Sequence, residues 1–426
     1  MTANLLDDLR WRGLIAESTD ETALAAALAR GPLTFYCGFD PTAPSLHFGN
    51  LVQLVTMRRF QEAGHHPIAV IGGATGLVGD PSGKSAERSL NDVAVVEAWV
   101  ERIRGQVQGL LRFEGDGAAR MVNNLEWTGD LGTISFLRDI GKHFSVARML
   151  AKESVSARLS TEGISFTEFS YQILQALDYL ELFRRYGTVL QTGGSDQWGN
   201  LTAGVDLIRR VEGVPVHALA TPLITRDDGS KYGKTEAGAI FLDPQLTSPF
   251  AFYQYFLNQA DADVVPLLKV FSFRDHEEIS ALADAIASHP EAREPQQVLA
   301  RDLTALVHGE VEMRRAVAAG EALFGSGDLR GLDETTLAAA LAALPRVAIL
   351  EELPSVLDLL VGSGLATSRS DARRTIVEGG AYLNHRRITD PASVVDAADL
   401  LHGRWLLLRR GRRKIGVAER SARAEG

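Results

Sequence analysis

The first half of the chain alternates short apolar runs with stretches of helical periodicity. Residues 33–37 and 67–71 are apolar runs that predict strands, and residues 51–63 between them carry apolar side chains at helical spacing. Another short strand is predicted at 189–192. Strand, helix and strand in this order favour a parallel sheet with helices on its faces, so the expected fold class is α/β.

Later segments depart from this alternation. Residues 127–182 are mostly helical in pattern, which indicates an insertion or a subunit-contact segment. Helical periodicity without strands runs from 248 to about 320 and predicts a helical domain. Gly325-Ser326-Gly327, followed by Pro345 and Pro354, indicates a linker before a last small module.

Charge and composition change this picture in two ways. The net charge of −10 argues against a nucleic-acid partner, but residues 364–416 hold 11 Lys and Arg against 5 Asp and Glu. A basic end can bind phosphates even in an acidic chain. The single cysteine, Cys37, excludes an internal disulfide, and no run of about 18 apolar residues predicts a membrane span. The cytoplasm is therefore the expected location.

A segment rich in proline and glycine follows the first predicted strand. Residues 36–50 (YCGFDPTAPSLHFGN) leave a strand and enter a helix. This geometry presents backbone N–H groups and the positive end of a helix to a phosphate. Thr42 and His47 can donate hydrogen bonds to phosphate oxygens, and Gly49 leaves room for a nucleotide base. Taken alone, such a segment is more commonly an ordinary helix cap with a satisfied histidine.

Three further segments carry candidate chemistry. Residues 72–84 (GGATGLVGDPSGK) do not form a P-loop, because Val78 stands where its first glycine is required. Residues 191–200 (QTGGSDQWGN) follow a predicted strand, and Lys231 and Lys234 lie in a loop-like stretch. Each could be a plain connection. Ligands bind beyond the carboxyl ends of parallel strands, however, so the glycine-rich exits should converge on one crevice.

One predicted helix carries three polar residues on a single face. Tyr171, Gln175 and Asp178 follow one another at steps of four and three residues. Such a face either meets one ligand or forms a polar stripe turned to solvent.

Taken together, these segments resemble class I aminoacyl-tRNA synthetases, most closely the bacterial tyrosine-specific type, over nearly the whole chain. Residues 35–50 resemble the family's His-Ile-Gly-His motif, and residues 231–235 (KYGKT) resemble its Lys-Met-Ser-Lys-Ser motif. More specific blocks of the tyrosine type are matched by residues 72–83, 165–171 and 193–200.

Two departures from the family pattern concern the short motifs. Asn50 replaces the second histidine of the first motif, and an amide can donate a hydrogen bond but cannot carry charge. Tyr232-Gly233 replaces the middle of the second motif, which keeps both lysines. Catalysis is expected to survive both changes.

The resemblance implies a domain order and a reaction. A Rossmann-like catalytic domain over residues 1–245, with a helical insertion and dimer contact near 127–182, would precede an α-helical anticodon-side domain at 246–322, a linker at 323–353 and a small α+β RNA-binding domain at 354–420. The reaction would be ATP-dependent activation of L-tyrosine to tyrosyl-adenylate, and then transfer of the tyrosyl group to the 3′-terminal ribose of tRNA(Tyr). A homodimer is implied, with Mg²⁺ accompanying the ATP and no metal bound by the protein itself.

The resemblance also assigns residues to roles in this reaction. Charge stabilisation at the phosphates would come from Thr42, His47, Lys84, Arg88, Lys231 and Lys234. The phenolic hydroxyl would meet Tyr36 and Asp178, and the ammonium group would meet Asp80, Tyr171 and Gln175. The ATP and adenylate would contact Cys37, Gly38, Asp40, Gly49, Asn50, Gly193, Asp196, Gln197 and Lys234, with Asp196 on the ribose. RNA would contact Arg369, Arg373, Arg374, Arg409, Arg410, Arg412, Arg413 and Lys414.

Three other functions compete with this interpretation. A tryptophan-specific enzyme of the same class is disfavoured by Tyr36, Asp178 and the basic C-terminal module. A non-catalytic RNA-binding descendant of a synthetase is disfavoured because His47, Lys231 and Lys234 are intact. A P-loop kinase is disfavoured by the failed spacing described above.

Overall fold

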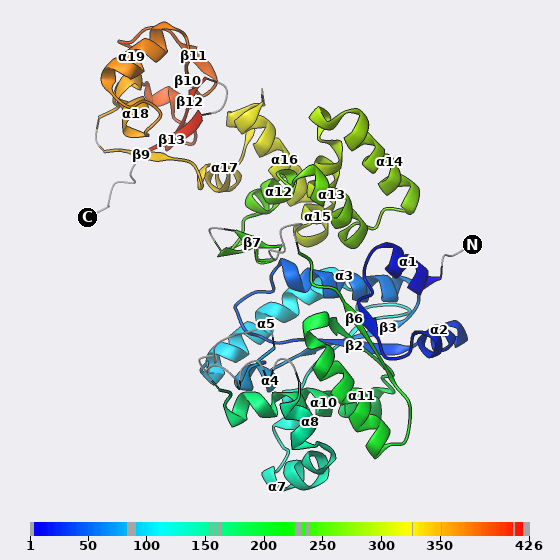
Figure 1. Ribbon diagram of the computed structural model, residues 1–426. Helices are drawn as coiled ribbons and strands as arrows, with labels where there is room; N and C mark the ends of the chain where they lie inside the picture. Colours follow the sequence, from blue (N-terminus) through cyan, green and yellow to red (C-terminus); the bar gives the residue numbers. More distant parts are fainter. Residues whose placement is uncertain are drawn as a thin grey trace. The chain divides into compact units, whose positions relative to one another are not determined.

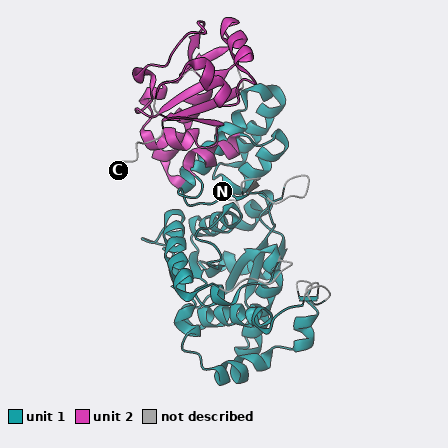
Figure 2. Cartoon of the chain, turned by 90° about the vertical axis from the view of Figure 1, so that its left-hand side faces the viewer, with its two compact units in different colours: residues 1–247, 258–307 teal, residues 248–257, 308–426 magenta. Residues whose placement is uncertain are grey.

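The computed structural model describes residues 4–82, 91–152, 155–156, 159, 163–225, 232–235, 238–325, 327–350, 352–411 and 414–420. The chain forms two compact units, coloured separately in Figure 2: residues 1–247 with 258–307, and residues 248–257 with 308–426. The segment predicted as a separate helical domain, 246–322, is thus divided between the two units.

The first unit is built on a six-stranded sheet, in the order β1-β6-β5-β2-β3-β4. Figure 1 labels its strands β2, β3 and β6, which lie among the helices of this unit. Five strands run parallel, and the short edge strand β1 runs antiparallel to β6. The strands are β1 (Glu17–Ser18), β2 (Thr34–Phe39), β3 (His66–Ile71), β4 (Arg120–Asn123), β5 (Leu190–Gly194) and β6 (His217–Thr221). The predicted α/β class with a parallel sheet is confirmed.

Helices cover both faces of this sheet because successive side chains of a strand point in opposite directions. Phe35 of β2 packs its ring 4.9 Å from Phe60 of helix α3, whereas the next residue, Tyr36, packs 5.2 Å from Tyr179 of α10. All four rings are buried. The apolar runs are therefore continuous along the strands, as expected for a sheet buried on both faces.

The helices of this unit fall into three groups along the chain. Those before the insertion are α1 (Leu5–Trp11), α2 (Glu21–Arg30), α3 (Phe48–Glu62), α4 (Thr75–Val78) and α5 (Val93–Leu110). The following ones are α6 (Leu125–Thr128), α7 (Thr133–Ser135), a π-helix (Phe136–Ile140), α8 (Val146–Leu150), α10 (Phe166–Tyr186) and α11 (Trp198–Val211). Then come α13 (Asp261–Phe271), α14 (His276–Ser288) and α15 (Glu294–His308).

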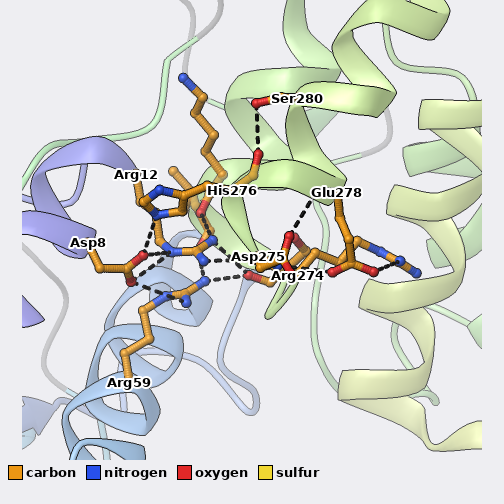
Figure 3. Close-up of polar contacts among 11 residues, drawn as sticks. Asp8, Arg12, Arg59, Arg274, Asp275, His276, Glu278 and Ser280 are labelled. Carbon is orange, nitrogen blue, oxygen red and sulfur yellow. Dashed lines mark hydrogen bonds and ion pairs between the residues drawn. The ribbon is translucent and has the colours of Figure 1, made fainter. Parts of the chain in front are cut away.

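Residues 258–307 belong to the sheet unit because two buried arginines tie them to it (Figure 3). Arg12, from the end of α1, donates to the carbonyl oxygens of Lys269, Ser272 and Arg274. Arg59 of α3 also donates to the Ser272 carbonyl, at 2.5 Å. The carbonyls at the end of α13 are a favourable place for cations. These hydrogen bonds join α1, α3 and α13, and no local sequence pattern predicts them.

The same cluster holds its own counter-charge. Asp8 of α1 accepts from Arg12 Nε at 2.9 Å and faces His276 Nε2 at 2.8 Å. Burial lowers the pKa of Arg59 to about 9, and Arg12 adds to this effect. The cluster of Asp8, Arg12 and Arg59 is therefore a packed polar core with little exposure to water.

The second unit places a five-stranded sheet between two layers of helix. The strands, in the order β11-β10-β12-β13-β9, are β9 (Arg346–Ile349), β10 (Ala381–Leu383), β11 (Arg386–Ile388), β12 (Trp405–Arg410) and β13 (Lys414–Arg420). The helices are α12 (Pro249–Leu257), α16 (Glu310–Phe324), α17 (Glu334–Leu341), α18 (Val356–Gly362) and α19 (Arg369–Val377). The expected small α+β module is present.

The side chains of β12 point alternately into two hydrophobic cores, one on each face of the sheet. Leu406 and Leu408 join the core under α18 and α19, whereas Trp405 and Leu407 join a second core with α16 and α17. The predicted linker at 323–353 contains α17 and β9, and β9 pairs in parallel with β13. It packs against the module because its few apolar side chains complete this second core.

Candidate active site

A cavity of about 520 Å³ in the first unit collects most of the predicted ligand-binding residues. It lies where β2, β3 and β5 end, so the predicted convergence of the glycine-rich strand exits is confirmed. The predicted residues that line it are Tyr36, Cys37, Gly38, Asp40, Thr42, His47, Gly49, Asn50, Asp80, Tyr171, Gln175, Asp178, Gly193, Asp196 and Gln197.

Several predicted cations are not placed by the structure. Lys84, Arg88 and Lys231 lie outside the described residues, as do Arg412 and Arg413 of the second unit. Only the backbone of Lys234 is described, where it pairs with Ala239 in the short β7–β8 ribbon (Lys234–Thr235 and Gly238–Ala239).

Asp178 lines the cavity, is buried, and is held through both carboxylate oxygens. Trp127 Nε1 donates to Oδ1 at 2.8 Å, and Asn124 Nδ2 donates to Oδ2 at 3.0 Å. Burial raises the pKa of Asp178 to about 7, although these two hydrogen bonds oppose the rise. Sequence reasoning missed Asn124 and Trp127, which follow the exit of β4. That exit was not recognised because β4 has only four residues.

Three polar atoms around the cavity are buried without a hydrogen-bond partner among the described residues. They are the hydroxyl oxygen of Tyr36 and the Oε1 atoms of Gln175 and Gln191. Burial, and then the charge of Asp178, raises the pKa of Tyr36 well above its ordinary value, so the hydroxyl stays protonated. Because buried polar groups are nearly always paired in native proteins, these atoms indicate a polar ligand.

Asp40, which lines the cavity, is positioned by two hydroxyl groups. Tyr171 donates to its Oδ2 at 2.6 Å, and Thr75 donates to its Oδ1 at 2.7 Å. A Cβ atom at Gly72 would lie 2.0 Å from Asp40 Oδ1, so any larger residue there would displace this carboxylate. Tyr171, predicted on the ammonium group, therefore also orients the carboxylate of Asp40.

A second carboxylate, Asp80, is held in a similar way. Gln197 Nε2 donates to its Oδ2 at 2.6 Å, and the backbone N–H of Ser82 donates to its Oδ1 at 2.9 Å. The Gln197 oxygen in turn accepts from Asn200 at 3.0 Å. Asp40 and Asp80 together make this part of the cavity suitable for a cationic group such as an ammonium.

His47 caps helix α3, and this role decides which ring nitrogen of the neutral side chain carries the proton. The backbone N–H of Gly49 donates to His47 Nδ1 at 3.0 Å, so the proton of a neutral ring lies on Nε2. Asn50 completes the cap, because its Oδ1 accepts from the His47 backbone N–H at 3.0 Å. A Cβ atom at Gly49 would lie 2.8 Å from the His47 ring. Gly49 is thus required by His47 itself.

The remaining lining residues favour binding over covalent chemistry. A Cβ atom at Gly38 would meet nothing within 4 Å, whereas one at Gly194 would lie 2.5 Å from Asp196 Oδ1. Gly38 therefore keeps the cavity wide, and Gly194 permits the position of Asp196. Burial raises the pKa of Cys37 to about 12, so its thiol stays protonated and is a poor nucleophile.

The predicted RNA-binding arginines differ in their surroundings. Arg369 pairs with Asp358 at 2.7 Å and Arg374 with Asp371 at 3.2 Å, yet both side chains remain mostly exposed. Arg410 instead holds both oxygens of Asp371, at 2.6 and 2.8 Å. Arg373 and Lys414 are exposed. Arg410 is thus engaged within the module, whereas Arg369, Arg373, Arg374 and Lys414 present charge to solvent.

Comparison with known proteins gives a family match for both parts of the chain. Residues 28–325 match the family described as tRNA synthetases class I (W and Y), and residues 336–417 match the Tyrosine--tRNA ligase SYY-like C-terminal domain. The chain is 59% identical to the tyrosine–tRNA ligase of Acidothermus cellulolyticus, over 98% of this chain and 99% of that one. Identity to the enzyme of Streptomyces griseus is 57%, over 98% of both chains.

Solved structures agree with these matches. A C-terminally truncated mitochondrial tyrosyl-tRNA synthetase of Aspergillus nidulans has a TM-score of 0.69 at 28% identity, over 76% of this chain and 94% of that one. The corresponding protein of Coccidioides posadasii has a TM-score of 0.65 at 30% identity, over 74% and 91%. The resemblance seen in the sequence is confirmed, and the chain belongs to the tryptophan and tyrosine family of class I tRNA synthetases.

Proposed function

We propose that this chain is a tyrosine–tRNA ligase, which makes tyrosyl-adenylate from L-tyrosine and ATP and esterifies tRNA(Tyr) at its 3′-terminal ribose. One observation carries the choice of amino acid: the buried hydroxyl of Tyr36, which has no hydrogen-bond partner among the described residues, lies near the buried carboxylate of Asp178. A phenolic hydroxyl satisfies both groups, because it donates to the carboxylate and accepts from Tyr36.

Competing amino acids would leave this pair incomplete. An indole N–H can donate to Asp178 but cannot accept from Tyr36, and phenylalanine can do neither. A buried polar group left without its partner costs about 1–3 kcal/mol. The site should therefore select tyrosine over both.

The rest of the cavity is suited to the other parts of the adenylate. Asp80, Tyr171 and Gln175 would hold the ammonium group, while Gly193, Gln197 and Asp196 would line the nucleotide, with Asp196 on the ribose. The other adenylate contacts are Cys37, Gly38, Asp40, Gly49, Asn50 and Lys234. The Nε2–H of His47 and the hydroxyl of Thr42 would donate to phosphate oxygens.

Catalysis in this proposal is charge stabilisation. Attack of the tyrosine carboxylate on the α-phosphate spreads negative charge over phosphate oxygens, which positioned donors and cations stabilise. Lys84, Arg88, Lys231 and Lys234 would supply the cations, and Mg²⁺ would arrive as the counter-ion of the ATP phosphates. The His47 cap supports this assignment, since it keeps a donor proton on Nε2.

We further propose that the chain works as a homodimer through its insertion at 127–182. This segment exposes large apolar side chains, among them Ile134 at 72%, Val146 at 61% and Phe166 at 75%. Exposed apolar groups gathered in one segment are typical of a protein–protein interface. A second copy of the chain is the partner that supplies a matching surface.

The tRNA would meet the basic second unit, and the reaction would take place in the cytoplasm. Arg369, Arg373, Arg374, Arg409, Arg410, Arg412, Arg413 and Lys414 are the proposed RNA contacts, which would act through phosphates and shape. Within the described part of the chain, the helices are too short or too polar to cross a bilayer.

The direct test is ATP–pyrophosphate exchange without tRNA, measured separately with tyrosine, tryptophan and phenylalanine. Exchange with tyrosine alone supports the proposal. Equal exchange with tryptophan would contradict the roles of Tyr36 and Asp178, and no exchange with any amino acid would contradict the activity itself.

A further inference from the structure

Ser45 lies two residues before His47 and uses every hydrogen-bonding position of its hydroxyl group. The hydroxyl donates to the Leu46 carbonyl at 2.7 Å. Its oxygen accepts from Gln106 Nε2 at 3.0 Å and from the backbone N–H of Asp243 at 3.1 Å. A serine hydroxyl offers one donor and two acceptor positions, so all three are occupied. This buried group therefore joins the loop after β2, helix α5 and the segment after β8.

Gln106 of α5 holds the same loop through both ends of its side-chain amide. Besides the donation to Ser45, its Oε1 accepts from the backbone N–H of Leu46 at 2.9 Å. Ser45 and Gln106 are not among the described residues that line the cavity. Gln106 thus fixes the backbone directly before His47 from outside the site.

Backbone hydrogen bonds hold His47 from both sides as well. An antiparallel bridge joins its segment to the residues after β8. On one side of the bridge, the Leu242 N–H donates to the Leu46 carbonyl at 2.9 Å. On the other side, the Phe48 N–H donates to the Ile240 carbonyl at 2.8 Å. The position of His47 therefore depends on the position of this neighbouring segment.

The neighbouring segment leads directly back to the second signature motif. The Ile240 N–H donates to the Gly233 carbonyl at 2.8 Å, and Gly233 comes immediately before Lys234. Gly233 has a φ angle of 78°, and a Cβ atom there would lie 3.0 Å from the Cβ of Phe48. Glycine in the middle of this motif allows the close approach, so the two motifs are in contact.

We propose that Ser45 and Gln106 are positioning residues for tyrosine activation. They fix His47 relative to the ribbon that carries Lys234, so that both motifs meet the same phosphates. Neither residue touches the substrates, and both act through His47. Charge stabilisation requires donors that are in place before the reaction, and a displacement of about 1 Å can cost about a hundredfold in rate. The inference rests on the proposed function, which assigns His47 and Lys234 to the phosphates.

Single-turnover formation of tyrosyl-adenylate tests this role. Gln106→Leu and Ser45→Ala should each lower the rate constant about ten- to a hundredfold and leave the Kd for tyrosine within about twofold. In a His47→Ala background, Gln106→Leu should cost less than about twofold, because its effect passes through His47. An equal loss in both backgrounds, or a loss confined to tyrosine affinity, would overturn the proposal. Ser45→Ala removes a single oxygen atom and carries the test if the larger change prevents folding.

Gln61→Leu is the matched control. Gln61 projects from α3 and holds a different loop, since it accepts from the Arg112 N–H at 3.0 Å and donates to the carbonyls of Arg112 and Gly117 at 2.7 and 2.8 Å. It does not belong to the described lining of the cavity. This variant should unfold at a lower urea concentration, yet its rate constant should stay within about twofold of the wild type. Equal rate losses in Gln61→Leu and Gln106→Leu would show that any loosened loop slows the reaction, and would overturn the specific role.

Amide hydrogen exchange tests the joint without any substrate. Gln106→Leu should speed exchange of the Leu46 amide, and Ser45→Ala should speed exchange of the Asp243 amide, each about tenfold or more. Unchanged protection at both amides would overturn the proposal. A wild type without tyrosine-dependent pyrophosphate exchange would instead overturn the proposed function, so the two failures are distinguishable.

Discussion

Trp127 Nε1 donates a hydrogen bond of 2.8 Å to Oδ1 of Asp178, and both side chains are buried. Trp127 comes from the short helix after β4, whereas Asp178 lies within α10. Asn124 holds the other oxygen of the same carboxylate at 3.0 Å. One donor on each oxygen fixes the plane of the carboxylate before any ligand arrives, which is the preorganisation that selective binding requires.

Tyrosine binding should strengthen as the pH rises through about 7. Burial raises the pKa of Asp178 from its ordinary 3.8 to about 7, and the ionised form accepts the phenolic hydrogen bond. Binding should therefore release a proton at low pH, and Kd should rise about tenfold for each pH unit below this pKa. Calorimetric titration with tyrosine between about pH 5.5 and 8.5 measures this, and a Kd independent of pH would contradict it.

The raised pKa of Asp178 also makes the stability of the fold depend on pH. An ion-paired carboxylate with a lowered pKa loses stabilising effect as the pH falls, whereas Asp178 loses it as the pH rises. The folded protein holds this proton more tightly than the unfolded chain does between pH 3.8 and about 7. The contribution of Asp178 to the free energy of unfolding is therefore highest below this window and falls as the pH rises through it. Tyrosine should offset the loss, because its hydroxyl favours the ionised carboxylate.

Trp127→Phe should weaken tyrosine binding without affecting ATP binding. A hydrogen bond to a charged group contributes about 1.5–3 kcal/mol, so the Kd for tyrosine should rise roughly ten- to hundredfold. The Trp127 hydrogen bond also lowers the pKa of Asp178, so its loss should move the pH midpoint of binding upward. A weaker affinity at an unchanged midpoint would indicate only a packing defect.

Sequence motifs predicted residues that the structure gathers around one cavity where the signal is local. Tyr36, His47, Asp80 and Gly193 lie in segments whose glycines and strand exits are visible in the sequence, and all four line the cavity. Asn124 escaped notice because it belongs to no such segment. Its role arises only when β4 comes to lie beside β3.

The grouping of the helices could not be predicted for a similar reason. Residues 258–307 have the pattern of an independent helical domain, yet Arg12 and Arg59 bind them to α1 and α3. An arginine that caps carbonyls more than 200 residues away leaves no periodic signal. Long-range polar contacts of this kind must be observed in three dimensions.

Gly72→Ala should slow tyrosine activation without removing any functional group. The new Cβ would lie 2.0 Å from Asp40 Oδ1 and 2.4 Å from Thr75 Oγ1, so both side chains must move. Misplacement of a site group by about 1 Å can cost about a hundredfold in rate. Single-turnover adenylate formation measures the effect, and a wild-type rate would show that the position of Asp40 is unimportant.

Gly38→Ala is the matched control for that substitution. Its Cβ would meet nothing within 4 Å, so the free energy of unfolding should stay within about 0.5 kcal/mol of the wild type. The added methyl group points into the space reserved for a ligand, and the KM for ATP should rise. A clear loss of stability in urea would contradict this separation.

Arg12→Ala should destabilise the first unit strongly. It removes donors from the carbonyls of Lys269, Ser272 and Arg274 and takes away one partner of Asp8, which keeps His276 at 2.8 Å. Breaking a buried ion pair of this kind costs about 3–5 kcal/mol, measurable by urea unfolding. Arg10→Ala, at a mostly exposed position on the same helix, should change the free energy of unfolding by less than about 1 kcal/mol. Equal losses in the two variants would show that the buried cluster has no special role.

The insertion should control the oligomeric state. Ile134→Asp places a charge on a side chain that is 72% exposed, so it cannot disturb the core of the subunit. It would, however, bury an unpaired charge in the proposed dimer contact, which proteins tolerate poorly. Light scattering after size-exclusion chromatography should show the wild type at twice the chain mass and the variant shifted toward a single chain. Leu350→Asp, at a residue 78% exposed in the second unit, should leave the mass unchanged. A wild type that runs as a monomer, or an Ile134→Asp variant that remains dimeric, would contradict assembly through this segment.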